Sequence, residues 1–371
     1  MKSVILALAT VSLIASPGDP LRGISPREFE LFRIGLDDFN EVETPEDGLG
    51  PAFNGNSCGQ CHSIPAIGGI ATMSETRGGY LDENGKFTAL NGVTLYNLFS
   101  TGNHACQVQI PSEANVIARR VPIPLFGAGL IEAIPDSQII ALEGNGGRAA
   151  RIIDVATGQP RIGRFGWKGQ HATLLAFSGD AYRNEMGITN DLFRDELAPG
   201  VTPQRMKLCD PIDGIEDVRN RITGLRAIDN FENFMKFLAP IERGPIDAEV
   251  LTGERVFAAI GCASCHVPQL TTGPSANPLF DRKPVNLFSD LLLHDIGTGD
   301  GIEQDGASGN EIRTPALWGL RMRRPLLHDG NAATPLHAIR AHQGEAAESS
   351  KNFAALTAED QRCLLAFLNS L

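Results

Sequence analysis

The sequence predicts a mainly α fold of two similar helical domains, the first carrying a long irregular insertion. Two observations predict it. An apolar helical pattern that ends just before a Cys-x-x-Cys-His motif occurs twice, once before Cys58 and once before Cys262. Between these repeats, about residues 68–225 are rich in Gly and Pro and show little helical periodicity. Because a bare loop of this length is exceptional in a compact domain, we expect the insertion to contain short helices and hairpins.

The first predicted helix begins at Ser25, which can cap its amino terminus. Pro26 suits the first helical turn, and Glu28 completes a capping box with Ser25. Apolar residues then recur at helical spacing up to the first motif. These apolar residues are Phe29, Phe32, Leu36 and Phe39.

Three later segments have the same helical character. Residues 245–261 form an apolar helical pattern that runs directly into Cys262, and Thr357 caps a final helix at the end of the chain. Residues 231–238 have the pattern of a closing helix for the first domain. We therefore predict an N-terminal domain at 24–240, with the insertion at about 68–225, and a C-terminal domain at 245–371.

The first residues predict export. Lys2 supplies a positive charge, and the apolar run from Val4 to Ala15 is too short to span a bilayer. We expect a signal peptide at residues 1–18, with an uncleaved anchor or a buried helix as the alternatives. No later stretch is apolar over the roughly 18 residues of a membrane span. The mature chain is therefore expected in the periplasm or otherwise exported, without a transmembrane segment.

Charge narrows the range of partners. The 371 residues carry a formal net charge of −12. Binding to nucleic acid or to an anionic membrane surface needs a basic face, so the charge argues against both. A small basic redox protein is compatible with this charge as electron donor or acceptor.

Four of the seven cysteines form two copies of one motif, Cys58-Gly-Gln-Cys61-His62 and Cys262-Ala-Ser-Cys265-His266. Cys-x-x-Cys-His is the attachment signature of c-type haem. In a short helical turn, each thiol can reach one vinyl group of the same porphyrin and form a thioether. The imidazole that follows then ligates the iron. The sequence therefore predicts two covalently bound haem c groups, with His62 and His266 as iron ligands.

A redox dithiol and a zinc site are the alternative interpretations of these cysteines. A thioredoxin-type motif needs a strand, turn and helix around it and does not explain a histidine after both pairs. The pairs begin at Cys58 and Cys262, much farther apart than the roughly 15 to 20 residues between the pairs of a typical zinc site. Haem attachment accounts for both the cysteines and the histidines.

The three other cysteines have simpler roles. Cys106 and Cys209 are the remaining pair outside helical patterns, so a disulfide between them is expected in an oxidising compartment, although the sequence leaves this pairing open. Cys363 lies in an apolar helical stretch and is expected to be a small buried hydrophobe.

His342 is the predicted sixth ligand of the second haem. Thr334 and Pro335 predict the start of a helix, and His342 follows Ile339 by three residues, which places its imidazole on the apolar face. An imidazole in an apolar core needs a partner, and haem iron is a suitable one. The alternative is a core histidine satisfied by hydrogen bonds.

Further polar residues near the second motif can serve the haem indirectly. His294 and His328 both precede an aspartate in turns, where they can bind a carboxylate or a haem propionate. Cations near this motif can pair the propionates or remain solvated. These cations are Arg313, Arg321, Arg323 and Arg324.

A helix, a haem motif, loops and a closing helix together are the plan of a cytochrome c domain, so we expect two cytochrome c-like domains. Several short segments recur in one protein family. They are residues 48–54, Phe165-Gly166-Trp167-Lys168, residues 185–189, Leu293-His294-Asp295-Ile296-Gly297, Arg313-Thr314-Pro315 and His328-Asp329-Gly330. From about Ser25 to Leu371 the chain resembles the di-haem oxidoreductase family, which is related to bacterial di-haem cytochrome c peroxidases and to the di-haem enzyme of methylamine utilisation.

The resemblance implies two unequal haems. In the peroxidases one haem transfers electrons with His and Met ligands, and the other opens a site for hydrogen peroxide. The Met ligand follows the His-Asp-Gly turn at the interval at which His342 follows His328 here. The resemblance therefore agrees with His342 as a ligand, with His in place of Met, and two histidines usually lower the reduction potential.

For the first haem the resemblance identifies neither a distal ligand nor a catalytic acid, because the acidic insertion motifs of the peroxidases are not recognisable. Candidates by position are His104, His171, Glu132, Glu185 and Met186. Of these, Glu132, His171 and Glu185 are the candidate catalytic residues.

The function expected from the sequence is that of an exported di-haem c-type oxidoreductase. Electrons would pass from the haem on His266 and His342 to the haem on His62, where peroxide could be reduced if the iron keeps an open position. The alternatives are a cytochrome that only transfers electrons and a haem-dependent sensor or binding module.

Overall fold

The computed structural model describes residues 15–371 except 105, 145, 211 and 213. Most of the expected signal peptide, residues 1–18, therefore lies outside the described residues. The helices are α1 (Pro26–Asn40), α2 (Cys58–Cys61), α3 (Ala128–Glu132), α4 (Asp136–Ile140), α5 (Leu174–Met186), α6 (Pro203–Cys209), α7 (Ala227–Phe237), α8 (Ala248–Ala259), α9 (Pro335–Ala341), α10 (Ala347–Ala355) and α11 (Ala358–Leu368). The strands are β1 (Ala52–Phe53), β2 (Glu75–Leu81), β3 (Phe87–Thr88), β4 (Leu95–Tyr96), β5 (Phe99–Ser100), β6 (Val116–Arg120), β7 (Ala150–Ile153), β8 (Pro160–Gly163), β9 (Leu270–Thr271), β10 (Pro284–Val285), β11 (Leu293–Asp295) and β12 (Glu311–Arg313).

Helix caps that the sequence predicts are present in the structure. Ser25 accepts a hydrogen bond from the backbone N–H of Glu28 and forms the capping box of α1. Thr334 caps α9 and Thr357 caps α11. These caps are formed by residues three positions apart, which is why the sequence alone reveals them.

Two helix pairs repeat the same packing. Helix α1 crosses α7, and α8 crosses α11. Each crossing has a glycine at the contact: a Cβ on Gly35 would collide with the backbone oxygen of Asn230, and a Cβ on Gly253 would collide with that of Cys363. These glycines let the two backbones of each pair approach closely. The two pairs are the part of the fold that the repeated sequence pattern predicts.

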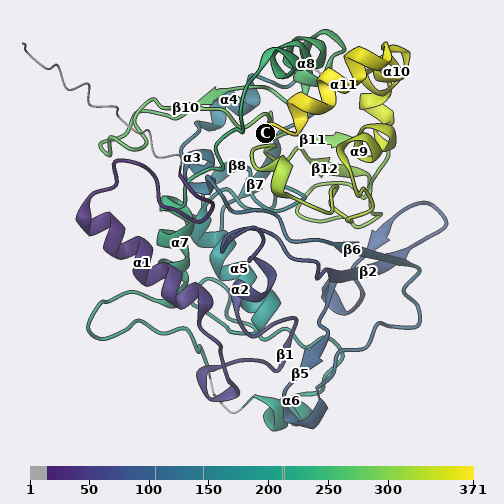
Figure 1. Ribbon diagram of the computed structural model, residues 1–371. Coiled ribbons are helices and arrows are strands. Elements are labelled where there is room, and N and C mark those ends of the chain that lie inside the picture. Colours follow the sequence, from purple (N-terminus) through teal and green to yellow (C-terminus); the bar gives the residue numbers. More distant parts are fainter. Residues whose placement is uncertain (1–14, 105, 145, 211, 213) are drawn as a thin grey trace, which may run out of the picture.

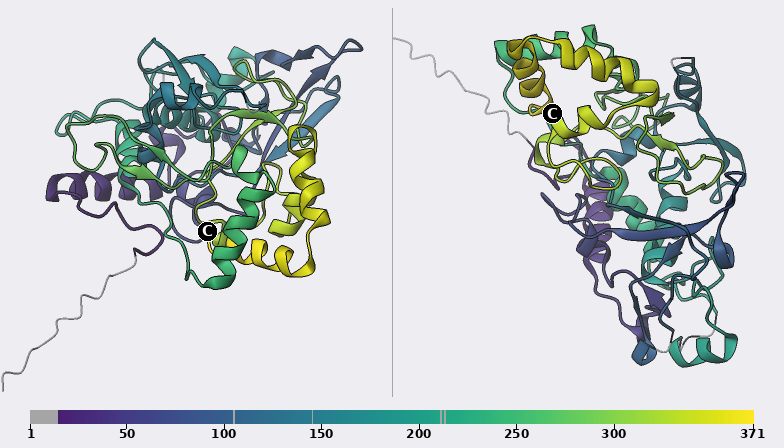
Figure 2. Two further views of the ribbon diagram at one scale, coloured as in Figure 1. Left: turned by 90° about the horizontal axis from the view of Figure 1, so that it is seen from above. Right: turned by 90° about the vertical axis from the view of Figure 1, so that its right-hand side faces the viewer.

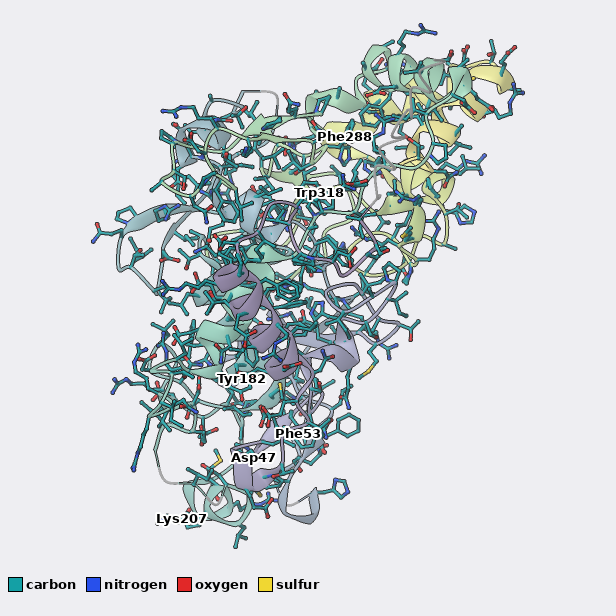
Figure 3. All side chains as sticks on the ribbon, turned by 60° about the vertical axis from the view of Figure 1, so that its left-hand side comes forward. Asp47, Phe53, Tyr182, Lys207, Phe288 and Trp318 are labelled. Atoms are coloured by element: carbon teal, nitrogen blue, oxygen red, sulfur yellow. A yellow bond between two sulfur atoms is a disulfide. The ribbon has the colours of Figure 1, made fainter. Side chains whose placement is uncertain are left out.

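The buried apolar residues form two main clusters. The larger one surrounds α1, α5 and α7 and includes Tyr182, and it extends to residues from the C-terminal half such as Leu292. The second lies around α8 and α11 and includes Phe288. Figure 3 shows Tyr182 and Phe288 well separated along the long dimension of the molecule, and Figure 2 shows the C-terminal helices at one end of it. The division into domains at 24–240 and 245–371 stays a prediction.

The insertion contains more regular structure than its sequence indicates. Strand β2 pairs antiparallel with β3, β4 and β6, and the turn at Asn84-Gly85 joins β2 to β3 in one of the hairpins expected for the insertion. Helix α5, which the sequence analysis did not predict, packs on α7 through Tyr182 and Phe231, whose ring centroids are 5.0 Å apart. A disulfide joins Cys106 to Cys209, as the sequence suggests.

The prediction of a mainly α fold is confirmed only in part. Helices account for 33% of the residues and strands for 14%, so short strands are a substantial second component. They are short because most belong to two-stranded ribbons inside loops. Cys363 is buried, as expected. Among the described residues, none of the helices combines the length and the apolar character needed to cross a bilayer.

Candidate functional site

Each Cys-x-x-Cys-His motif lines its own large cavity. The first cavity encloses about 1270 Å³ between its lining atoms, part of it open to solvent, and contains Cys58, Cys61 and His62 in its wall. The second encloses about 1280 Å³ and is lined by the second motif. The two motifs therefore face two separate spaces of similar size.

The first motif forms the short helix α2. The backbone N–H of His62 donates to the oxygen of Cys58 at 3.1 Å, which closes the turn and brings both thiols to the cavity. Nδ1 of His62 lies 2.9 Å from the oxygen of Gly69. A carbonyl oxygen only accepts, so Nδ1 carries the hydrogen and the Nε2 lone pair is free. Burial lowers the pKa of His62 to about 4, which keeps the imidazole neutral.

The second motif repeats this arrangement. The backbone N–H of His266 donates to the oxygen of Cys262 at 3.0 Å, and Nδ1 of His266 lies 3.2 Å from the oxygen of Phe288. Burial lowers the pKa of His266 to about 4. A neutral imidazole with its Nδ1–H held by a carbonyl is the form that binds a metal through Nε2.

The cysteines of both motifs are free thiols. Burial raises the pKa of Cys58 to about 12 and the pKa values of Cys61 and Cys262 to about 11. Since the two pairs line different cavities, they cannot bind one zinc ion together. Within the described chain neither pair is oxidised to a disulfide. Each motif thus offers its own cavity two thiols and one imidazole, the set that attaches haem c.

His342 faces His266 across the second cavity. Their ring centroids are 6.4 Å apart. Two metal–nitrogen bonds of about 2 Å and about 1 Å from each nitrogen to its ring centre sum to about 6 Å, so one metal ion could bind both imidazoles. Nδ1 of His342 lies 2.6 Å from the oxygen of Ala338, so its Nε2 is also free. Burial lowers the pKa of His342 as well.

One detail of the His342 prediction is wrong. Helix α9 ends at Ala341, and His342 is its C-terminal cap rather than a residue of its apolar face. The chain leaves the helix at this point because Gln343 and Gly344 turn toward β11, where the backbone N–H of Gln343 donates to Ile296. The imidazole nevertheless lines the second cavity.

Among the described residues, no histidine besides His62 lines the first cavity. Helix α5 contributes Tyr182, Glu185 and Met186 to its lining, and β2 contributes Glu75 and Arg77. Several of these groups can form hydrogen bonds, so this lining differs chemically from that of the second cavity, which includes His342.

Glu75 and Glu185 form an acidic pair in the first cavity. Burial, with the nearby charge of Glu75, raises the pKa of Glu185 to about 8. Burial also opposes ionisation of Glu75, but the guanidinium of Arg77, 2.6 Å away, outweighs it and lowers the pKa of Glu75. Nδ2 of Asn54 donates to Glu185 at 2.7 Å. At neutral pH, Glu75 is charged and Glu185 holds a proton.

Glu185 is the one of the three candidate catalytic residues that lines the first cavity, as far as the described residues show. Glu132 lies outside it, because its carboxylate accepts a hydrogen bond from the backbone N–H of Leu174 at the start of α5. His171 also lies outside it and binds Asp180 at 3.0 Å. Of the other positional candidates, His104 is exposed and Met186 lines the cavity.

Two buried arginines line the second cavity. Arg313 donates to the oxygen of Gly166 at 2.8 Å, and the guanidinium of Arg323 lies 5.6 Å from the ring centre of Trp167. Burial lowers the pKa of both to about 10, and neither forms an ion pair within the described part of the chain. Buried unpaired cations suit an anionic ligand group such as a propionate. Arg321 and Arg324 instead donate to backbone oxygens and lie outside this cavity.

The two histidines beside aspartates differ in their surroundings. His294 lies between Asp290 at 2.8 Å and Glu345 at 2.6 Å. Although burial opposes it, the hydrogen bond with Asp290 raises the pKa of His294 to about 11. Nε2 of His328 lies 3.9 Å from Asp300, and burial lowers its pKa. His294 therefore binds carboxylates, as one of its predicted roles requires.

Trp167 lies between the two cavities. It is the single residue of the described chain that lines both of them. Its indole is buried, and Nε1 donates to the oxygen of Val121 at 2.8 Å. This hydrogen bond and the neighbouring Arg323 hold the ring in one orientation.

The sequence analysis named Glu185 and Met186 of α5 but missed Tyr182 of the same helix and Glu75 and Arg77 of β2, which also line the first cavity. For α5 a signal existed: Thr173 caps its start, Gly187 has φ of 75° at its end, and apolar residues lie between. For Glu75 and Arg77 there was none, because β2 reaches the cavity only through its pairing with distant strands.

Comparisons with known proteins identify one family and several distantly similar structures. The family model described as "Di-haem oxidoreductase, putative peroxidase" matches residues 98–371, which include the second motif but not the first. Three solved structures are distantly similar: hydrazine synthase of Kuenenia stuttgartiensis (17% identity, 100% of this chain and 99% of that chain, TM-score 0.43), a MauG-like protein associated with microbial copper homeostasis (15%, 98% and 94%, 0.45) and the di-haem peroxidase BthA of Burkholderia thailandensis E264 (15%, 94% and 86%, 0.45). No curated protein matches the chain.

Proposed function

Since this chain belongs to the di-haem oxidoreductase family, we propose that it is an exported c-type enzyme that reduces peroxide at a haem in the first cavity. The electrons come from a haem in the second cavity. The observation that carries this proposal is the difference between the cavities. A second imidazole faces His266 at a ring separation of 6.4 Å, whereas no described histidine faces His62.

The four motif cysteines attach the haems. Each thiol adds its S–H across one vinyl double bond, which forms a C–S bond without any net transfer of electrons. The separate cavities and the free state of all four cysteines support two attachment sites. Arg313 and Arg323 bind propionates in the second cavity.

A haem held by Cys58, Cys61 and His62 would supply one-electron chemistry for the reduction of peroxide. In the first cavity, Glu185 holds a proton at neutral pH and donates it to the oxygen that leaves when the O–O bond breaks. Glu75 keeps that proton on Glu185 by its own charge, and Arg77 holds Glu75 in place. Two electrons and two protons convert one peroxide molecule into two water molecules.

Trp167 carries the electrons between the two haems. It lines both cavities, and its hydrogen bond to Val121 fixes it there. The electron donor is a small redox protein, and the net charge of −12 favours a basic one. The disulfide between Cys106 and Cys209 supports an exported location, because disulfides persist in oxidising compartments.

Electron paramagnetic resonance of the holoprotein tests the proposal. In the oxidised form we expect a high-spin ferric signal from the first haem beside a low-spin ferric signal from the second. One reducing equivalent should remove the low-spin signal, because the second haem takes the electron, and leave the high-spin one. Peroxide should consume the high-spin signal. Two low-spin signals in the oxidised form, with no high-spin signal after one reducing equivalent, would contradict the proposal and indicate an electron-transfer cytochrome. A Met186→Ala variant then tests whether this methionine, which lines the first cavity, is the extra ligand.

A further inference from the structure

A third cavity opens beside the first one. It encloses about 1390 Å³, part of it open to solvent. Arg77, Gln170, Asp180 and Asn184 line both this cavity and the first, so the two spaces are neighbours separated by single side chains. A small molecule that enters the third cavity therefore lies next to the first haem site.

The wall of this third cavity is amphipathic. Arg77 and Asp180, which also line the first cavity, contribute polar groups to this wall, as does His171. Ile153 and Val155 lie in its apolar part, with 63% and 46% of their surface exposed. Hydrogen peroxide is small and polar and gains nothing from such an apolar wall. An apolar group attached to the peroxide would gain from covering it.

Arg183 and Phe193 place another polar group beside an apolar ring in the third cavity. The guanidinium of Arg183 lies 4.9 Å from the ring centre of Phe193, and both residues line the third cavity. Arg183 also lies 3.7 Å from Asp180, yet its buried Nε has no hydrogen-bond partner among the described residues. This N–H can donate to an oxygen of a ligand beside the ring.

From this geometry we propose that the protein also reduces organic hydroperoxides, whose apolar part lies against Ile153, Val155 and Phe193 while the peroxide group reaches the first cavity. The inference rests on the proposed peroxide reduction at the first haem and names its substrate class. The reaction breaks the O–O bond of ROOH. Two electrons from two molecules of a reduced one-electron redox protein, and two protons, one of them from Glu185, give the alcohol ROH and water. The alcohol leaves through the third cavity.

The test uses the holoprotein with a reduced c-type cytochrome as donor. We expect turnover of cumene hydroperoxide with a kcat/KM within about tenfold of that for hydrogen peroxide. In Ile153→Asp and Val155→Asp, the kcat/KM for cumene hydroperoxide divided by that for hydrogen peroxide should fall by about 10-fold or more. An apolar pocket contact typically discriminates between substrates by about 10- to 200-fold. Ile117→Asp is the matched control, because Ile117 is also exposed, at 55%, and lines none of the three cavities. Its ratio should stay unchanged.

The outcomes separate this inference from the proposed function. If neither peroxide is consumed, the proposed function fails and the inference fails with it. If hydrogen peroxide is consumed and cumene hydroperoxide is not, the inference alone is overturned. An unchanged ratio in both Ile153→Asp and Val155→Asp would also overturn it, because the apolar wall would then not bind the organic part.

Discussion

In both haem cavities, a phenylalanine of the preceding helix lies beside the motif histidine, and a carbonyl oxygen accepts the hydrogen bond from its Nδ1. The ring centres of Phe39 and His62 are 6.0 Å apart, and those of Phe257 and His266 are 6.2 Å apart. The rest of the two linings differs, apart from Trp167, which the cavities share. His342 faces His266, whereas the carboxyl pair of Glu75 and Glu185 belongs to the first cavity.

Under the proposed function, this difference would separate two roles within a repeated scaffold. With His342 as a second imidazole ligand, the second cavity would suit a haem that transfers electrons. With a protonated carboxyl group and no second histidine in its lining, the first cavity would suit the reduction of peroxide. The attachment motifs would then hold the haems, and the other lining residues would set their different chemistry.

Replacing the acid in the first cavity should have the largest effect. We expect Glu185→Gln to lower kcat for peroxide by about 10²- to 10⁴-fold, the usual range for loss of a general acid. Glu132→Gln is the matched control, since Glu132 is also a buried carboxyl group with a raised pKa but lies outside the cavity. Steady-state kinetics of the two variants would measure this. Equal losses in both would remove Glu185 from its assigned role.

The second cavity is tested by changing its far ligand. We expect His342→Met to raise the reduction potential of the second haem by on the order of 0.1 V, a fraction of the roughly 0.8 V that axial ligands span. His337→Met provides the control, because His337 is exposed in α9, the helix that ends just before His342, and does not line the cavity. Spectroelectrochemical titration measures both. A potential that does not move would mean that His342 is not a ligand.

The two helix crossings, α1 with α7 and α8 with α11, should lose similar stability when their contact glycines are replaced. Both crossings pack through a glycine in the same way. We expect Gly35→Ala and Gly253→Ala each to lower the free energy of unfolding by about 1 to 3 kcal/mol through overpacking. Gly244→Ala is the control, since its Cβ would meet only ordinary contacts of 3.6 Å or more. Thermal unfolding of the holoprotein compares them. A stable Gly253→Ala beside an unstable Gly35→Ala would show that the two crossings are not equivalent.

The common parts of the two cavities could be predicted from the sequence, and the differing parts mostly could not. Ser25, Thr334 and Thr357 cap helices through residues three positions away, and the attachment motifs span five residues. Such signals are local. His342 could also be found, because a helix and a short turn connect it to its neighbours in sequence.

The acidic pair arises from contacts that are distant in sequence. Glu75 and Glu185 are brought together by β2 and α5, and Asn54 joins them from a third segment. No periodicity links these positions. Glu132 and His171 were equally plausible by sequence, and only the packing of α5 excludes them from the cavity.

The smallest expected effect is a difference between the two haems in how their reaction rates depend on pH. Burial and Glu75 raise the pKa of Glu185 to about 8, so Glu185 loses its proton as the pH rises through 8. We expect kcat for peroxide to fall about tenfold per pH unit above that value, because the acid form is then the minor one. The rate of electron uptake by the second haem, measured by stopped flow, should not fall in this pH range, since Glu185 is not in the second cavity. In Glu185→Gln the decrease of kcat above pH 8 should disappear. A decrease near pH 8 that persists in this variant would assign the proton to another group.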